Sequence, residues 1–111
     1  MEYIVDMSTV VDSREVVINR IRDLAPRLRA LGVSRLALFG SFLGNRQHSA
    51  SDVDLLVEFF PGSKTFDNFS NACDLLEDAL GRRVELVTVD SLSPFIGPKI
   101  LREAIDVYVS A

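Results

Sequence analysis

Apolar residues recur along the chain at spacings that predict alternating helices and strands. The first stripe has the three- and four-residue spacing of a helix. It follows a capping-box pattern at Asp12–Glu15 and stops at Gly32, a residue that readily adopts the left-handed conformation of a helix end. Pro26 should break or kink this helix. The stripe consists of Val17, Ile21, Leu24, Leu28 and Leu31.

Two short apolar runs are typical of buried strands. The first, Arg35–Phe39, ends at Gly40, and the second, Val53–Phe60, is closed by Pro61–Gly62. The second run is apolar on both faces along most of its length, which predicts a central strand.

A second helical stripe lies between Thr65, a plausible N-cap, and the stop residue Gly81. A third strand is predicted over Val84–Val89, and Pro98 suits the first turn of a last helix that carries Ile100, Leu101, Ala104 and Ile105. Residues 107–109 fit either a strand or the end of that helix. The second stripe, including a core cysteine, consists of Phe66, Phe69, Cys73, Leu76 and Leu80.

The order helix, strand, turn, strand, helix, strand, helix indicates an α/β (α+β) fold in which helices pack on a small sheet. Residues 1–11 fit a loose arm or a short strand. With 111 residues, of which 48% are hydrophobic, the chain is expected to form one domain over residues 1–111, with its motif-bearing core at about residues 34–90. Its apolar runs are too short to cross a membrane.

The net charge and the cysteine content exclude some classes of protein. The formal net charge of −4 argues against a protein that holds bulk DNA or RNA by neutralising phosphates. A nucleoside triphosphate would then bind together with divalent cations. The single cysteine, Cys73, excludes an internal disulfide. The N-terminus lacks the pattern of a secretory signal, so a cytoplasmic location is expected.

The candidate chemistry lies in the stretch from Gly40 to Phe59. Asp52 and Asp54 are two residues apart at the mouth of a strand, so their side chains leave the same face. Neighbouring carboxylates repel unless a cation meets them, and Mg²⁺ is the obvious candidate. Gly40 and Ser41 end the preceding strand and are expected to open a short helix whose N–H groups could meet phosphate oxygens. Taken singly, the Gly-Ser pair is better explained by a plain strand-to-helix turn, and the two aspartates by a helix cap or a solvated acidic pair.

Taken together, these residues resemble the signature of the polymerase β-like nucleotidyltransferases. That signature is Gly-Ser, ten intervening residues, and Asp-x-Asp running into an apolar strand. The likeness extends over residues 13–108 and is greatest to the minimal nucleotidyltransferase (MNT) domains. It is carried by Leu-Ala-Leu-Phe-Gly-Ser at 36–41, Asp-Leu-Leu-Val-Glu-Phe at 54–59 and Gly-Arg-Arg-Val-Glu-Leu-Val-Thr at 81–88.

The resemblance implies a small mixed sheet and a catalytic carboxylate triad. Glu85 occupies the place of the third carboxylate, where the family usually has Asp. Asp52, Asp54 and Glu85 would hold two Mg²⁺ ions, while Gly40 and Ser41 would steady the phosphates of ATP. After the Gly-Ser pair the family often has a small residue, Arg and Gly, whereas this chain has residues 43–46, Leu-Gly-Asn-Arg.

Three further polar residues near the motif have two interpretations each. His48 is either a solvated loop residue or a contact to the nucleotide or substrate. Arg82 and Arg83 are either a surface charge pair or a contact to phosphate.

The resemblance also implies a partner. MNT proteins are commonly encoded beside a HEPN-domain ribonuclease toxin and act as its antitoxin by transferring AMP from ATP to a toxin tyrosine, as in a type VII toxin–antitoxin pair. Two alternatives are an antitoxin that neutralises its partner by occlusion alone and a nucleotidyltransferase subunit acting on a small molecule. The base preference, the number of nucleotides transferred and assembly into a homo-oligomer stay open at this point.

Overall fold

The computed structural model describes residues 11–44, 47 and 51–110. Helix α1 (Arg14–Asp23) begins one residue later than the capping-box pattern predicts, because the hydroxyl of Ser13 accepts the Val16 N–H, at 3.3 Å, in place of the Asp12 side chain. Helix α2 (Ala25–Ala30) follows after a break at Leu24. Its first turn contains Pro26, where a missing N–H costs no hydrogen bond. The predicted interruption of the first helix is therefore confirmed.

The strands form one mixed sheet in the order β3-β2-β1-β4. Strand β1 (Val33–Phe39) pairs antiparallel with both β2 (Val53–Phe59) and β4 (Ile105–Val109). Strand β3 (Val84–Thr88) runs parallel to β2. The predicted central position of the second strand is confirmed. Residues 105–109 form a strand, although Ile105 was expected in the last helix.

The parallel pair β2–β3 is connected through helix α3 (Phe66–Leu80). The hydroxyl of Thr65 accepts the Asn68 N–H at 3.1 Å, and Gly81 ends the helix with φ 68°, so both predicted ends are confirmed. A 3₁₀ turn, η2 (Val89–Ser91), and helix α4 (Gly97–Glu103) connect β3 to β4. Val89, which was predicted as the last residue of the third strand, lies in this turn, because β3 ends at Thr88. None of the helices in the described part of the chain has the length and apolar content needed to span a bilayer.

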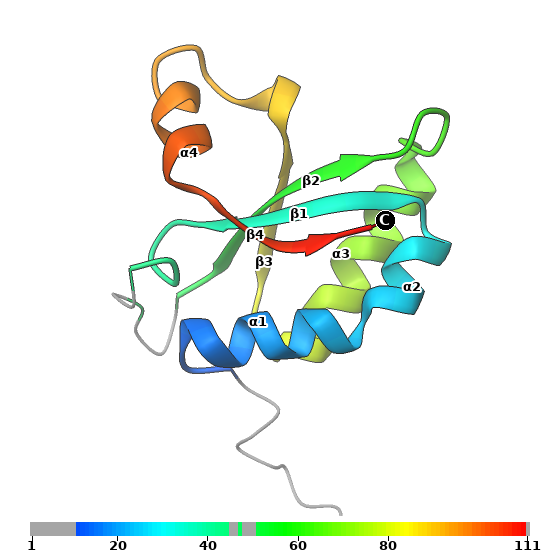
Figure 1. Cartoon of the computed structure of the whole chain (residues 1–111), viewed down its shortest axis with the longest axis horizontal. Helices are drawn as coiled ribbons and strands as arrows, with labels where there is room; N and C mark the ends of the chain where they lie inside the picture. Colours follow the sequence, from blue (N-terminus) through cyan, green and yellow to red (C-terminus); the bar gives the residue numbers. More distant parts are fainter. Residues whose placement is uncertain (1–10, 45–46, 48–50, 111) are drawn as a thin grey trace, which may run out of the picture.

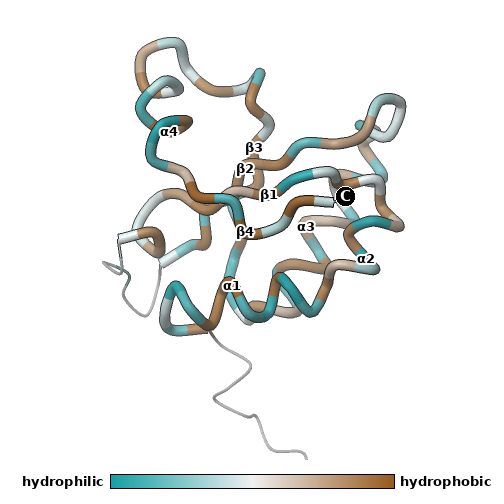
Figure 2. Tube along the Cα trace, in the orientation of Figure 1, coloured by the Kyte–Doolittle hydropathy of each residue, from teal (hydrophilic) through white to brown (hydrophobic). Residues whose placement is uncertain are grey.

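The two faces of the sheet have different neighbours (Figure 1). Helices α1, α2 and α3 lie on one side, and α4 lies on the other. Figure 2 shows hydrophilic and hydrophobic residues alternating along α1, as expected of a helix with one buried stripe. The hydrophobic core lies between these three helices and the sheet, and its fully buried members include Ile21, Leu28, Leu36, Leu38, Leu55, Leu76 and Leu80.

Strand β2 contributes to both faces. Val53, Leu55 and Val57 point into the core, whereas Leu56 is buried outside the core cluster, as is its pairing partner Ala37 on β1. Side chains alternate along a strand, so Asp54 shares the face of Leu56. This face is the one that α4 flanks.

The stripe on α3 supports a direct comparison of buried and exposed positions. Leu76 is fully buried, whereas Phe66, which we predicted to belong to the stripe, is 82% exposed. We expect Leu76→Ala to lower the free energy of unfolding by about 2–5 kcal/mol, because it removes packed methyl groups and leaves a cavity. Phe66→Ala on the same helix should change it by less than about 0.5 kcal/mol. Urea unfolding followed by circular dichroism measures both, and equal losses would contradict the assigned core.

Candidate functional site

Strand pairing brings together two of the three predicted carboxylates. In the parallel register of β2 and β3, Asp54 is the partner of Glu85. Paired residues on neighbouring strands point to the same face, so these two side chains lie side by side on the face flanked by α4. Asp52 stands two residues before Asp54, where β2 begins. Asp52 and Asp54 are half-buried, and Glu85 is exposed.

The pKa of Asp54 depends on its burial and on the two neighbouring carboxylates. The pKa of Asp54 is raised to about 6, first by partial burial of its carboxyl group and then by the negative charges of Glu85 and Asp52. Each cause disfavours the ionised form. Three carboxylates on one face therefore leave a local excess of negative charge that a bound cation would neutralise.

The donor set suits a hard divalent cation. Carboxylate oxygens are the ligands that Mg²⁺ prefers in proteins, and the raised pKa of Asp54 marks a place where positive charge is favourable. Within residues 11–44, 47 and 51–110, no three acidic, histidine or cysteine side chains converge into a ready-made cage. The three carboxylates thus fit the metal by donor type and by the face that they share, and they do not form a preformed three-ligand cage.

Gly40 is required at its position by two independent constraints. Its φ of 79° lies in the left-handed region that side chains disfavour. A Cβ at this position would also overlap the Asp54 carboxylate and stand 2.9 Å from its Cγ. Gly40, directly after β1, therefore makes room for the Asp54 carboxyl group of the neighbouring strand β2.

The segment after Gly40 forms a turn and differs from the short helix that we predicted. Residues 41–44 are a turn closed by a hydrogen bond of 3.2 Å from the Leu43 N–H to the Gly40 carbonyl. A helix dipole therefore adds nothing at Ser41, which is half-buried beside the carboxylates. Asn45, Arg46 and His48 lie outside the described residues, so their predicted roles stay predictions.

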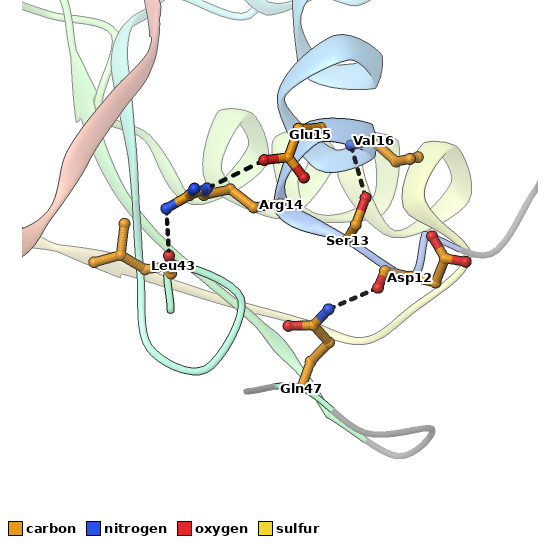
Figure 3. Close-up of polar contacts among 7 residues, drawn as sticks. All are labelled: Asp12, Ser13, Arg14, Glu15, Val16, Leu43 and Gln47. Atoms are coloured by element: carbon orange, nitrogen blue, oxygen red, sulfur yellow. Dashed lines mark hydrogen bonds and ion pairs between the residues drawn. The ribbon is translucent and has the colours of Figure 1, made fainter. Parts of the chain in front are cut away.

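The turn is fastened to the start of α1 (Figure 3). The Arg14 side chain donates to the Leu43 carbonyl at 2.8 Å, and the Gln47 amide donates to the Asp12 carbonyl at 2.6 Å. Both contacts join segments about 30 residues apart in the sequence. They hold the residues that follow Ser41 against the body of the protein.

A groove of about 630 Å³ opens beside this turn. Its walls are the end of β1, the Gly40–Gly44 turn and α4, so it adjoins the carboxylates. The lining combines apolar side chains with a single lysine, Lys99, and an acid, Glu103. The sequence did not single out Lys99, because only the fold brings α4 opposite Gly40. A second groove of about 460 Å³ lies farther along the sheet, near Arg35 and Lys64.

Arg82 contacts three other parts of the protein and is not the surface charge that was one of its two predicted roles. Its side chain donates to the carbonyl oxygens of Val11, at 2.7 Å, and Ser51, at 3.2 Å. The guanidinium also stacks over the Phe42 ring, 5.1 Å from its centre. The prediction of a surface charge is therefore wrong for Arg82, whereas its contact to phosphate stays a prediction. Arg83 is exposed, and its carbonyl accepts the Val53 N–H.

Comparisons with known proteins agree with this geometry. The family model described as "Nucleotidyltransferase domain" matches residues 18–107. A Methanocaldococcus jannaschii protein named "Putative protein adenylyltransferase" is 41% identical over 91 residues, covering 81% of this chain and 97% of that protein. "Protein adenylyltransferase MntA" of Thermococcus cleftensis is 32% identical over 101 residues, covering 89% and 96%.

Solved structures give the same result for the fold. A structure described as a "putative minimal nucleotidyltransferase" is 32% identical, with a TM-score of 0.73, and covers 84% of this chain and 94% of that one. Chains from solved toxin–antitoxin complexes, one of them a tri-AMPylated HEPN toxin of Shewanella oneidensis with its MNT antitoxin, share the fold at 18–24% identity and TM-scores of 0.58–0.65. The predicted fold class and family resemblance are confirmed.

The raised pKa of Asp54 makes a pH-dependent prediction. The folded protein holds this proton up to about pH 6, whereas the unfolded chain releases it near 3.8. The contribution of Asp54 to stability is therefore present at low pH and is lost as the pH rises from about 4 through about 6. We expect Asp54→Asn to be more stable than wild type at pH 7.5, with a difference that shrinks towards pH 4, in urea unfolding without metal.

The control for this prediction is Asp74→Asn, which removes an exposed acid on α3. The free energy of unfolding of Asp74→Asn, relative to wild type, should not change between pH 4 and pH 7.5 in the way expected for Asp54→Asn. A pH-independent gap between Asp54→Asn and wild type would contradict the raised pKa of Asp54.

Proposed function

The chain belongs to the nucleotidyltransferase domain family, and we propose that it transfers AMP from ATP to a hydroxyl group of a partner protein. One observation carries the proposal: the β2–β3 register sets Asp54 beside Glu85, with Asp52 close enough to raise the pKa of Asp54. The names of the Methanocaldococcus and Thermococcus relatives support AMP as the group transferred and protein as the acceptor.

Asp52, Asp54 and Glu85 are the proposed ligands of Mg²⁺, with two ions expected by resemblance to the family. When bound, Mg²⁺ would neutralise the phosphates and lower the pKa of the attacking hydroxyl. That hydroxyl oxygen forms a bond to the α-phosphorus of ATP, the α–β phosphoanhydride bond breaks, and pyrophosphate leaves. We assign the hydroxyl proton to Glu85, the most exposed carboxylate of the three.

The turn and the groove beside it are the proposed nucleotide site. Backbone N–H groups at Gly40 and Ser41, with the Ser41 hydroxyl, would donate to the β- and γ-phosphates. The groove of about 630 Å³ offers apolar walls for the nucleoside. Positioning and charge neutralisation supply most of the rate in phosphoryl-group chemistry, so these contacts are central to the proposed reaction.

The proposed acceptor is a tyrosine of a HEPN-type toxin, for which this chain would be the antitoxin. Support comes from the resemblance to MNT antitoxins and from the high identity to the relatives named protein adenylyltransferases. We place this reaction in the cytoplasm, where ATP and Mg²⁺ are available. Intact Asp52 and Asp54 favour catalysis over inhibition by occlusion alone.

Intact-mass measurement of the protein and its co-purified partner, after incubation with ATP and Mg²⁺, tests the proposal. We expect the partner to gain one or more AMP units with wild type and none with Asp54→Asn, because that variant removes a ligand carboxylate. Asp74→Asn should behave as wild type. A stable complex without any mass gain would favour occlusion, and transfer by Asp54→Asn at the wild-type rate would refute the role of Asp54.

Lys99 allows a separate test of the nucleotide groove. Its ammonium group lines the groove that adjoins the Gly40 turn, so it is placed to offset phosphate charge. We expect Lys99→Gln to weaken binding of a non-hydrolysable ATP analogue about tenfold, the loss of one charge-assisted contact, as measured by calorimetry with Mg²⁺. Lys64→Gln, in the second groove and ion-paired to Asp90, is the matched control. Equal effects of the two variants would place the nucleotide elsewhere.

A further inference from the structure

The Arg82 guanidinium stands where three separate parts of the chain meet. It donates to Ser51, the residue before Asp52, and stacks on Phe42, the residue after Ser41. It also donates to Val11, whose own N–H donates to the Leu80 carbonyl at 2.9 Å. One side chain therefore contacts the immediate neighbours of both halves of the Gly-Ser and Asp-x-Asp motif.

The partners of Arg82 lie in buried or hydrogen-bonded parts of the fold. Phe42 and Val11 are fully buried. Arg82 itself comes just before β3, and the Val53 N–H donates to the Arg83 carbonyl at 2.9 Å. Arg82 thus lies three residues before Glu85 on a segment that is already bonded to the start of β2. A displacement of the guanidinium is therefore expected to change the positions of Ser41, Asp52 and Glu85 together.

The contacts require an arginine in particular. A guanidinium is planar, presents five N–H donors in a fixed fork and offers a flat face for stacking on an aromatic ring. Here two edges of the fork bond to two carbonyl oxygens while the face covers Phe42. A lysine ammonium keeps the positive charge and lacks both the fork and the flat face, so it cannot hold all three partners in one geometry.

We propose that Arg82 is a positioning residue that sets the distance between the Gly40–Ser41 turn and the Asp52–Asp54 carboxylates. It acts through Phe42 and the Ser51 carbonyl and does not itself contact the nucleotide or the metal. The inference rests on the proposed function for its catalytic consequence. The effect of Arg82 on the binding of metal and nucleotide can be measured without catalysis.

Arg20 provides a matched control. Its guanidinium likewise donates to a backbone carbonyl of a distant element, that of Ala79 at 2.9 Å. That contact joins α1 to the end of α3, on the side of the sheet away from the carboxylates. Arg20→Lys and Arg82→Lys therefore remove the same kind of bond, and only the second lies next to the motif.

The test compares wild type, Arg82→Lys, Arg82→Gln and Arg20→Lys. Binding of Mn²⁺, as a spectroscopic substitute for Mg²⁺, is measured by electron paramagnetic resonance with a non-hydrolysable ATP analogue, and melting temperatures are measured without ligand. We expect both Arg82 variants to lose about 10–100-fold in Mn²⁺ affinity, the range for residues that orient metal ligands. Arg20→Lys should keep the wild-type affinity, although it too loses a guanidinium hydrogen bond to a backbone carbonyl.

AMP transfer to the partner gives the second readout. In Arg82→Lys we expect a lower kcat and a higher Mg²⁺ concentration at half-maximal rate, because the ligands are displaced while the charge is kept. Wild-type behaviour of Arg82→Lys with loss in Arg82→Gln would show that charge alone matters and would overturn the proposal. Equal effects of Arg82→Lys and Arg20→Lys on Mn²⁺ affinity would overturn it as well.

Two further outcomes would still allow the role of Arg82 to be tested. If Arg82→Lys fails to fold, Phe42→Leu removes the stacking partner while keeping an apolar side chain in the core, and wild-type Mn²⁺ affinity in that variant would contradict the proposal. If wild type transfers no AMP, the proposed function fails, and the Mn²⁺ measurements still decide the role of Arg82.

Discussion

Repulsion among three carboxylates on one face of a sheet is the constraint on which the site depends. The parallel register of β2 and β3 sets Asp54 beside Glu85, and Asp52 stands two residues away on the same strand. The pKa of Asp54 is raised first by partial burial and then by the charges of Glu85 and Asp52, which shows the cost of this arrangement. Such a site persists only because other interactions hold its strands in register.

The opposite face of β2 supplies that support. Val53, Leu55 and Val57 are buried in the core cluster and alternate with Asp54 and Leu56 on the other face. A slip of one residue in register would move these three side chains out of the core, so the packing energy of one face fixes the positions of the charges on the other. The core thus stabilises an arrangement of charges that is unfavourable by itself.

Local features of this fold were largely predictable, whereas contacts between distant segments were not. Thr65 and Gly81 end α3 as predicted, because caps and left-handed stops depend on a few neighbouring residues. The shift of the first cap from Asp12 to Ser13 reflects two adjacent residues with equally suitable side chains. Phe66 keeps the spacing of its stripe, yet it lies in the first turn of α3 with 82% of its surface exposed.

The site follows the same division. Asp52, Asp54 and the Gly40–Ser41 pair were predicted from spacing, since they lie within one short stretch. Glu85 was predicted only by family resemblance, because pairing between β2 and β3 leaves no local pattern. The contacts of Arg82 were not predicted, because two of its partners are backbone carbonyls. Every residue has a carbonyl, so a contact of this kind has no signature in the sequence.

The order in which the sheet can assemble has a consequence for the metal site. Strands β1 and β2 are joined directly and pair antiparallel, whereas β3 reaches β2 only after the whole of α3 has been laid down as a crossover. Parallel pairing across such a distance is intrinsically slow to form. A chain that has formed only the β1–β2 pair already carries Asp52 and Asp54 and lacks Glu85 beside them. The complete set of proposed ligands therefore exists only in the fully folded molecule, so partly folded chains are not expected to compete for the proposed cation.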